Sequence, residues 1–325
     1  MRELDRWHRA PRRLESDLSV APEFEEALDA FSTIWAGEAG AYAARLRIEL
    51  PSAFGREFEG FAAAFAGEGV PGLERSLGAS GARGPAWMAW TEALVEEALR
   101  RGLERTAGPA LGRLLEAMDA DDYPRARLLE LQSYAATLRA RVRDWLPQED
   151  YKVVSGDSLD LIGTKYRKKG HMLRFGWMME FNSRSSDRIR LDETLRIPLA
   201  PLHLLGLRSH CVLALYAGGT PIHLYEVSYG KPGFETPAGS FTLKEFLKEP
   251  VDYGLNPPVP YGHPKHRLGT RWISFLEDES YGIHGNNNRD QVGSHESAGC
   301  VRMINAEVEE LFELVPRGAK VEIRP

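Results

Sequence analysis

Hydrophobic residues in the first part of the chain recur at helical spacing. In "EFEEALDAFSTIW", residues 23–35, every third or fourth position is apolar. In "WMAWTEALVEEALRRGLERT", the same spacing links Trp87, Trp90, Leu94 and Leu99. The pattern predicts amphipathic helices whose aromatic side chains form core rather than a ligand site.

Two interruptions divide this helical part. The glycine, serine and proline content of "VPGLERSLGASGARGP", residues 70–85, predicts a flexible connector. Two further helical runs between residues 111 and 146 flank "MDADDYP", where acidic residues and a proline favour a helix stop and restart. We therefore expect an α-helical domain of unknown role over residues 1–147.

After Pro147 the pattern changes to a short mixed unit. "YKVVSGDSLDLIGTKY" begins with a β-rich run, turns at "SGD" and continues with Leu159, Ile162 and Tyr166 on one side of a helix. "DRIRLDETLRIP" then indicates a second strand. The sequence thus predicts a small β-helix-β domain over residues 148–200.

Strand patterns dominate residues 203–325. Two apolar runs joined by "AGGT" predict a hairpin, and "RWISFL" and "KVEIRP" supply further strands. "NAEVEELFELV", residues 305–315, is the one helical run of this part, with Asn305 as its expected N-cap. We expect a mostly antiparallel sheet or sandwich here, and a multidomain α+β fold for the whole chain.

Composition excludes several classes of protein. The 325 residues are 43% hydrophobic and 27% charged, and the net charge of −6 argues against nucleic-acid binding through a broad basic surface. Two cysteines cannot form a disulfide framework, and no Cys/His group has zinc-ligand spacing, so no structural metal is expected. The start lacks the apolar run of a signal peptide, and no window has the length of a membrane span.

One cysteine has neighbours suited to catalysis. Cys300 lies in "HESAGCVRM", and His284 in "GIHGNNN" precedes it by 300 − 284 = 16 residues. A nucleophilic Cys300 needs a thiolate, which an adjacent imidazole favours, and N–H donors such as those of Gly299 and Cys300 for the oxyanion. Arg302 adds positive charge. Taken alone, these residues leave open that Cys300 is an ordinary core residue.

Other candidates carry weaker signals. Cys211 in "SHCVLALY" is expected in the core, and Ser294 and Ser297 lack the Gly-x-Ser-x-Gly setting of a serine nucleophile. The spacing of His263 and His266 suggests a metal site, but no third ligand stands at a supporting interval, so a solvated or substrate-facing loop is expected.

Three segments in order distinguish between these interpretations. "TPAGSF" (236–241), "GIHGNNN" (282–288) and "SAGCVRM" (297–303) resemble the motifs of the L,D-transpeptidase catalytic domain, also called YkuD. The resemblance implies Cys300 as nucleophile and His284 as general base. It further implies that the Gly285 carbonyl orients the imidazole and that Ser297, Gly299 and Arg302 shape the motif loop and oxyanion hole. This chain departs from the family at Ala298, where a His is frequent, and His295 is a possible substitute.

The small unit also has a resemblance. Its pattern is similar to the LysM module, a βααβ fold that binds N-acetylglucosamine polymers, and the matching positions are Tyr151, Val153, Gly156, Asp157, Ser158, Leu159, Ile162, Tyr166, Asn182, Leu195, Ile197 and Pro198. The resemblance implies glycan binding around Gly156, Asp157, Ser158 and Asn182. The stretch from Tyr166 to Asn182 is longer and more basic than usual, and a spacer without sugar binding is the alternative.

Together the resemblances imply an extracytoplasmic enzyme that remodels peptidoglycan without a cofactor. Its implied partners are stem peptides and glycan strands, with an amine of a second stem or of a lipoprotein as acceptor. Since no signal peptide is visible, we expect a missing export signal or another route. Two alternatives are an inactive wall-binding scaffold and a cysteine L,D-carboxypeptidase acting on the same stems.

Overall fold

A computed structural model describes residues 55–81, 85–117, 125–286 and 288–325. These residues fall into two compact units, Met1–Ala98 and Leu99–Pro325, which are described separately. The helix expected over residues 23–35 and the turn at "MDADDYP" lie outside the described residues.

The first unit contains α3 (Gly55–Ala79) and most of α4 (Pro85–Arg100). The Trp87 indole N–H donates to the Leu77 carbonyl at 3.0 Å, and the Phe65 and Trp90 rings lie 6.5 Å apart. The connector predicted for residues 70–85 is wrong over its first ten residues, which are helical up to Ala79. Val70, Leu73 and Leu77 recur at helical spacing and are buried, so core packing outweighs the glycine and proline content.

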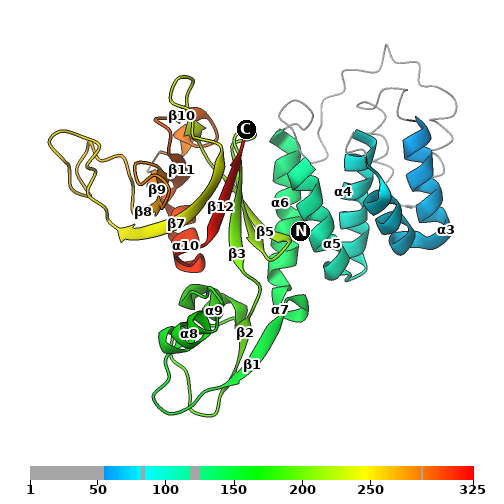
Figure 1. Ribbon diagram of the computed structural model, residues 1–325, viewed down its shortest axis with the longest axis horizontal. Helices are drawn as coiled ribbons and strands as arrows, with labels where there is room; N and C mark the ends of the chain where they lie inside the picture. Colours follow the sequence, from blue (N-terminus) through cyan, green and yellow to red (C-terminus); the bar gives the residue numbers. More distant parts are fainter. Residues whose placement is uncertain (1–54, 82–84, 118–124, 287) are drawn as a thin grey trace, which may run out of the picture. The chain divides into compact units, whose positions relative to one another are not determined.

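The second unit is built on an eight-stranded sheet with the order β11-β9-β8-β7-β12-β3-β4-β5 (Figure 1). Five of its seven strand pairs are antiparallel, while β11 with β9 and β12 with β3 are parallel. The bounds are β3 Leu202–Leu207, β4 Val212–Ala217, β5 Thr220–Glu226, β7 Gly239–Lys248, β8 Arg271–Phe275, β9 Gly282–Asn286, β11 Val301–Ile304 and β12 Lys320–Arg324. Two short strands, β6 (Tyr229–Gly230) and β10 (His295–Ser297), form a separate parallel pair.

Helix α10 (Asn305–Leu314) packs on β8, β9 and β11 and buries Val308, Leu311 and Phe312. Asn305 is its first residue and not its N-cap, which is Ile304. The Asn305 side chain instead accepts a hydrogen bond from the Thr270 N–H at 3.1 Å. The expected cap therefore links the helix to the segment that precedes β8. A one-turn 3₁₀ helix, Arg289–Gln291, lies between β9 and β10.

Three more helices belong to the second unit: α5 (Glu104–Ala117), α6 (Arg125–Ala140) and α7 (Val142–Trp145). Helices α5 and α6 pack on β5. A Cβ on Gly108 would lie 2.4 Å from Thr220 Oγ1, and one on Gly112 would lie 2.7 Å from the Gly219 carbonyl oxygen. The missing side chains thus allow α5 to approach the β4–β5 turn closely.

The boundary expected at Pro147 does not coincide with the boundary of the compact unit. Residues from Leu99 onward group with the sheet, because α5 and α6 are packed against its last strand. The helical domain expected over residues 1–147 stays a prediction, since residues 1–54 lie outside the described part of the chain. No helix in the described ranges is long and apolar enough to cross a membrane.

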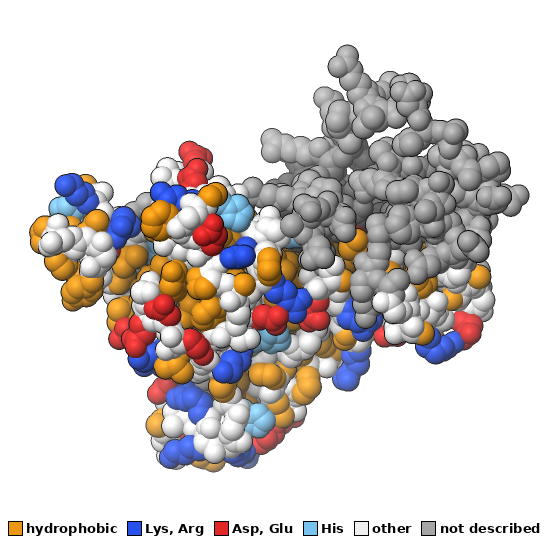
Figure 2. All heavy atoms as spheres, turned by 45° about the horizontal axis from the view of Figure 1, so that its top comes forward, with side chains coloured by type: hydrophobic (Ala, Val, Ile, Leu, Met, Phe, Trp, Pro, Cys, Tyr) orange, Lys and Arg blue, Asp and Glu red, His pale blue; other side chains and the backbone are white. Residues whose placement is uncertain are grey.

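A βααβ unit follows α7. It comprises β1 (Gln148–Lys152), α8 (Leu159–Lys168), α9 (Phe175–Phe181) and β2 (Thr194–Pro198), with β1 and β2 antiparallel. Tyr166, Trp177 and Phe181 are fully buried at its centre. On the face shown in Figure 2, Lys and Arg side chains are interspersed with Asp and Glu.

Candidate active site

Two parallel strands bring the segments of Cys300 and His284 together. Strand β11 pairs with β9 in the register Arg302↔His284, and Cys300 directly precedes β11. Paired residues of adjacent strands share a face, so Arg302 and His284 project to the same side. The charges of Arg302, Arg267 and Asp252 act on both the Cys300 thiol and the His284 imidazole, so the two groups share one neighbourhood.

His284 is buried and oriented by one hydrogen bond. Its Nδ1 lies 2.8 Å from the Gly285 carbonyl oxygen, and the Trp272 ring stacks at 5.9 Å between centroids. Since a carbonyl only accepts, Nδ1 carries the proton and Nε2 presents a lone pair. Burial lowers the pKa of His284 to about 4, against the opposing effect of the Gly285 bond. The imidazole is therefore neutral at pH 7.

Cys300 is also neutral at rest. Burial raises the pKa of its thiol, while the Gly282 N–H and the charges of Arg302 and Arg267 act in the opposite direction. The sulfur lies 3.8 Å from the Ser280 carbonyl oxygen. Among the described residues, no hydrogen bond connects the sulfur to His284. The thiolate that the sequence led us to expect is thus not favoured here, because burial outweighs the nearby cations.

The motif loop is held by Ser297. Its hydroxyl donates to the Cys300 carbonyl oxygen at 2.6 Å and accepts from the Gly299 N–H at 3.2 Å. Gly299 has a φ of +110°, and a Cβ there would lie 2.5 Å from the Tyr281 ring. The Gly299 N–H, expected to line an oxyanion hole, is instead engaged with Ser297.

Arg302, the second residue of β11, contributes positive charge near Cys300. Its backbone N–H donates to the Ser228 carbonyl at 2.9 Å, and its carbonyl accepts from the Ser228 N–H at 2.8 Å. Burial lowers the pKa of its guanidinium, and the charge of Cys300 opposes this. Arg302 thus favours negative charge at the sulfur.

An ion pair between a buried carboxylate and a half-exposed arginine near the site was not predicted from the sequence. The Asp252 carboxylate, 1% exposed, accepts hydrogen bonds from Arg267 Nε at 2.7 Å and Nη2 at 2.9 Å. The next residue, Leu268, accepts a bond from the Gly285 N–H at 3.1 Å, so this segment runs along β9 beside His284. "YGHPKHRLG" offers no local signal for the pair, since its partner lies 15 residues away.

His263, His266 and Cys211 each have a polar contact of their own. His266 Nε2 lies 2.7 Å from the Pro250 carbonyl, and His263 Nδ1 accepts from the Lys265 N–H at 3.1 Å. Cys211 is buried beside β4, and its sulfur lies 3.7 Å from Nε2 of His295, which is exposed. Within the described residues, no group of three or more His, Cys, Asp or Glu side chains is arranged to hold a metal.

The residues expected to bind glycan lie in the loops of the βααβ unit. Asp157 accepts from the Tyr151 hydroxyl, the Val154 N–H and Lys165 Nζ at 2.9, 2.9 and 2.6 Å. Asn182 joins α9 to β2 through bonds of 2.8 Å with Met178 and Arg196.

Ser158 caps α8 by accepting from the Leu161 N–H at 3.2 Å, and Gly156 has a φ of +87°. The described polar contacts of Asp157, Ser158 and Asn182 therefore fix the loop backbone.

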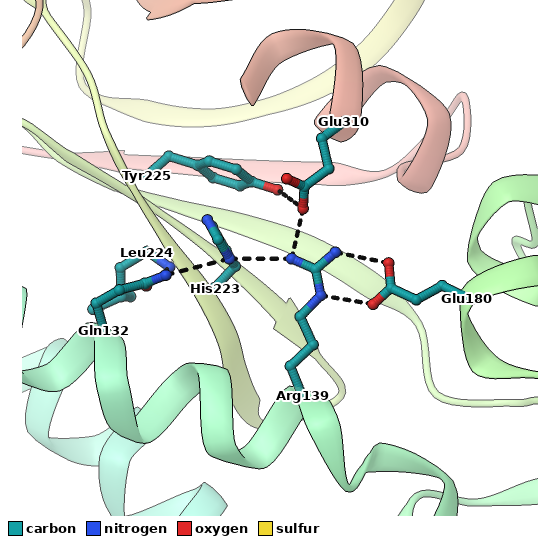
Figure 3. A network of polar contacts seen from close by, with 7 residues as sticks. All are labelled: Gln132, Arg139, Glu180, His223, Leu224, Tyr225 and Glu310. Atoms are coloured by element: carbon teal, nitrogen blue, oxygen red, sulfur yellow. Dashed lines mark hydrogen bonds and ion pairs between the residues drawn. The ribbon is translucent and has the colours of Figure 1, made fainter. Parts of the chain in front are cut away.

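A second polar cluster joins three parts of the second unit (Figure 3). Arg139 of α6 donates to both carboxylate oxygens of Glu180 on α9, at 2.6 and 2.7 Å, and pairs with Glu310 of α10 at 2.6 Å. Its Nη1 also lies 3.1 Å from His223 Nδ1 of β5. Gln132 accepts from the Leu224 N–H of the same strand at 2.6 Å. We call this cluster the Arg139 junction.

The charge of Arg139 is strongly stabilised. Burial disfavours it, but the hydrogen bonds and charge of Glu180 and the charge of Glu310 outweigh burial and raise the pKa of Arg139. Strand β5 is the last of the sheet, so Gln132 also satisfies an N–H that an edge strand would expose. The junction thus fastens α6 and the βααβ unit to the sheet.

Comparison with known proteins concerns the sheet domain. Residues 206–323 match the family model YkuD, the L,D-transpeptidase catalytic domain. YqjB of Bacillus subtilis, named as belonging to the L,D-transpeptidases, is 38% identical over 104 residues, which are 31% of this chain and 58% of that protein. YkuD of Bacillus licheniformis is 28% identical over 181 residues, 54% of this chain and 98% of that protein.

Solved structures are also similar to this part of the chain. An L,D-transpeptidase from Mycobacterium tuberculosis aligns with a TM-score of 0.34 and 13% identity, covering 41% of this chain and 62% of that one. The similarity to the L,D-transpeptidase catalytic domain thus rests on the family model and the sequence relatives, and the family model covers residues 206–323. The chain spans little more than half the length of YqjB.

Proposed function

We propose that this protein, whose residues 206–323 match the L,D-transpeptidase catalytic domain, is a cysteine-dependent transpeptidase of peptidoglycan. The observation that supports the proposal is the β9–β11 register, in which Arg302, two residues after Cys300, pairs with an oriented, neutral His284. A nucleophile beside a base that is itself held by a third group is the arrangement required for acyl transfer.

The reaction begins from the neutral pair. The Cys300 sulfur attacks the carbonyl of the L-centre of the diamino acid in a tetrapeptide stem, while His284 Nε2 accepts the thiol proton. The carbon–nitrogen bond then breaks, and the imidazolium returns the proton to the amine of the departing D-alanine. Arg302 and Arg267 favour the negative charge that develops near the sulfur.

The thioester is resolved by an amine or by water. The amine of a second stem yields a cross-link, the amine of a lipoprotein yields an anchored protein, and water yields a shortened stem. Because peptidoglycan stems lie outside the cytoplasmic membrane, the proposal places the protein there.

We also propose that the βααβ unit is a LysM-type module that anchors the enzyme to glycan strands. The support is its β1-α8-α9-β2 order and the loop structure that Gly156, Asp157, Ser158 and Asn182 maintain. Tethering would raise the effective concentration of stems at Cys300 without a new catalytic contact.

The test is covalent trapping. We would incubate the protein with disaccharide-tetrapeptide and, in parallel, with a carbapenem, and follow both by intact mass. We expect D-alanine release, dimer formation and a carbapenem adduct, all absent from Cys300→Ala.

Cys211→Ala is the matched control, since Cys211 lies in the same domain and should leave the adduct unchanged. An adduct that persists in Cys300→Ala and disappears in Cys211→Ala would reject Cys300 as the nucleophile. Turnover without dimers would indicate the carboxypeptidase instead.

A further inference from the structure

A basic cleft lies where the βααβ unit meets β7 and the end of α10, close to the contact of α9 with α10. Its volume is about 550 Å³. Four cationic side chains line it, those of Arg167, Arg174, Lys248 and Arg317, against one carboxylate, that of Asp160. None of the residues proposed for catalysis or for glycan anchoring lines it.

Arg174 is the central group of this cleft. Its guanidinium lies over the Phe246 and Phe312 rings, 4.6 and 4.7 Å from their centroids, and donates to the Val315 carbonyl at 3.3 Å. Within the described residues, no carboxylate lies within ion-pair distance of it. Burial lowers the pKa of Arg174, against the charge of Glu313. A half-buried guanidinium without an ionic partner is costly, and an oxyanion would complete it.

The surrounding cations leave a net positive charge. Arg317 is exposed at the loop after α10. Lys248 pairs with Glu313 at 2.9 Å, and Arg167 lies 3.8 Å from Asp160. After these pairings, Arg174 and Arg317 keep unneutralised guanidinium groups in one cleft. Arginine binds carboxylate and phosphate through two parallel hydrogen bonds, which makes it suited to oxyanion recognition.

We propose that this cleft binds an oxyanion of a cell-wall polymer, with Arg174 and Arg317 as its ligands. The polymer context rests on the proposed function, but the anion chemistry depends only on the cleft. Both the carboxylates of stem peptides and the phosphodiesters of wall polymers have the required group. Both the βααβ unit and the sheet domain line the cleft. A wall polymer bound there would therefore contact both parts.

The experiment measures binding of Cys300→Ala protein to purified peptidoglycan sacculi by co-sedimentation at about 0.15 M salt, where charges beyond about 8 Å are screened. In that background, Arg174→Gln and Arg317→Glu should each weaken binding by about tenfold. Lys168→Glu, also at an exposed position close to Arg167 but not lining the cleft, should change it less than about twofold. Arg317→Glu removes an exposed side chain and so tests the cleft even where Arg174→Gln is poorly folded.

Two treated preparations identify the source of the anion. Removal of phosphodiesters with hydrofluoric acid abolishes the Arg317-dependent binding if phosphate is the ligand, and amidation of stem carboxylates abolishes it if carboxylate is. The proposal is overturned if both variants bind like their parent, if Lys168→Glu loses as much, or if neither treatment has an effect. Since no turnover is needed, failure of the transpeptidase proposal would leave this result intact.

Discussion

The site around His284 and the Arg139 junction are both polar clusters inside the second unit, yet they treat charge in opposite ways. Arg139 is fully charged and has Glu180, Glu310 and His223 as partners. His284 is neutral, and its hydrogen bond to Gly285 involves Nδ1 alone. In the Arg139 junction the guanidinium has several polar partners, whereas at the site His284 Nε2 is unprotonated.

The difference separates the stabilising from the reactive use of a buried polar group. A buried charge with several hydrogen bonds fixes the elements that supply them, here α6, α9, β5 and α10. A buried imidazole with one bond is held in orientation but remains a base for an incoming proton. Substitutions of His284 and of the junction residues should therefore have different effects.

The largest effect is expected on the acylation rate. His284→Gln removes the base while keeping a neutral side chain of similar size, so stopped-flow acylation by a carbapenem should slow by about 10²–10⁴-fold. His203→Gln in β3 is the control, because His203 stacks on Tyr216 away from Cys300. A rate within twofold of the parent for His284→Gln would show that His284 is not the base.

Acid should destabilise the protein through the same residue. The folded pKa of His284, about 4, lies below the unfolded value of 6.5, so its contribution to stability is present above pH 6.5 and is lost as pH falls toward 4. The shift corresponds to about 3 kcal/mol. Urea unfolding at pH 7.5 and 4.5 should show a smaller acid loss in His284→Gln than in the parent, and equal losses would contradict the assignment.

Breaking the junction should cost stability without directly affecting the chemistry. Arg139→Ala leaves Glu180 and Glu310, each about a third exposed, without their cation, and we expect a loss of about 2 kcal/mol in the free energy of unfolding.

Lys152→Ala in the βααβ unit removes a pair with Asp192 in which both side chains are two-thirds exposed, and it should cost less than about 1 kcal/mol. Similar losses in both variants would show that the junction is no stronger than a surface pair.

The smallest effect concerns the edge of the junction. The Tyr225 hydroxyl lies 3.4 Å from Glu310 Oε1, a long hydrogen bond. Tyr225→Phe should therefore cost only about 0.5 kcal/mol by denaturant unfolding. A loss as large as that of Arg139→Ala would place Tyr225 among the main contacts of the cluster.

Local patterns were sufficient for much of the fold. The apolar runs and turn residues in residues 203–325 predicted the sheet and the "AGGT" hairpin, and three motifs in order pointed to the catalytic domain that the family model matches. Helical spacing also predicted α4 around Trp87 and Trp90. These features depend on contacts between residues close in the sequence, or on short motifs, and so are visible in the chain itself.

Long-range packing decided the rest. The partners of Arg139 lie 41 and 84 residues away at Glu180 and His223, so no local spacing reveals the junction or the attachment of α6 to the sheet. The sequence by itself pointed to Cys300 and His284 as the candidate reacting pair. Only the tertiary structure decided that Cys300 rests as a thiol beside a neutral His284, because the pKa of each depends on burial, and burial is a property of the assembled fold.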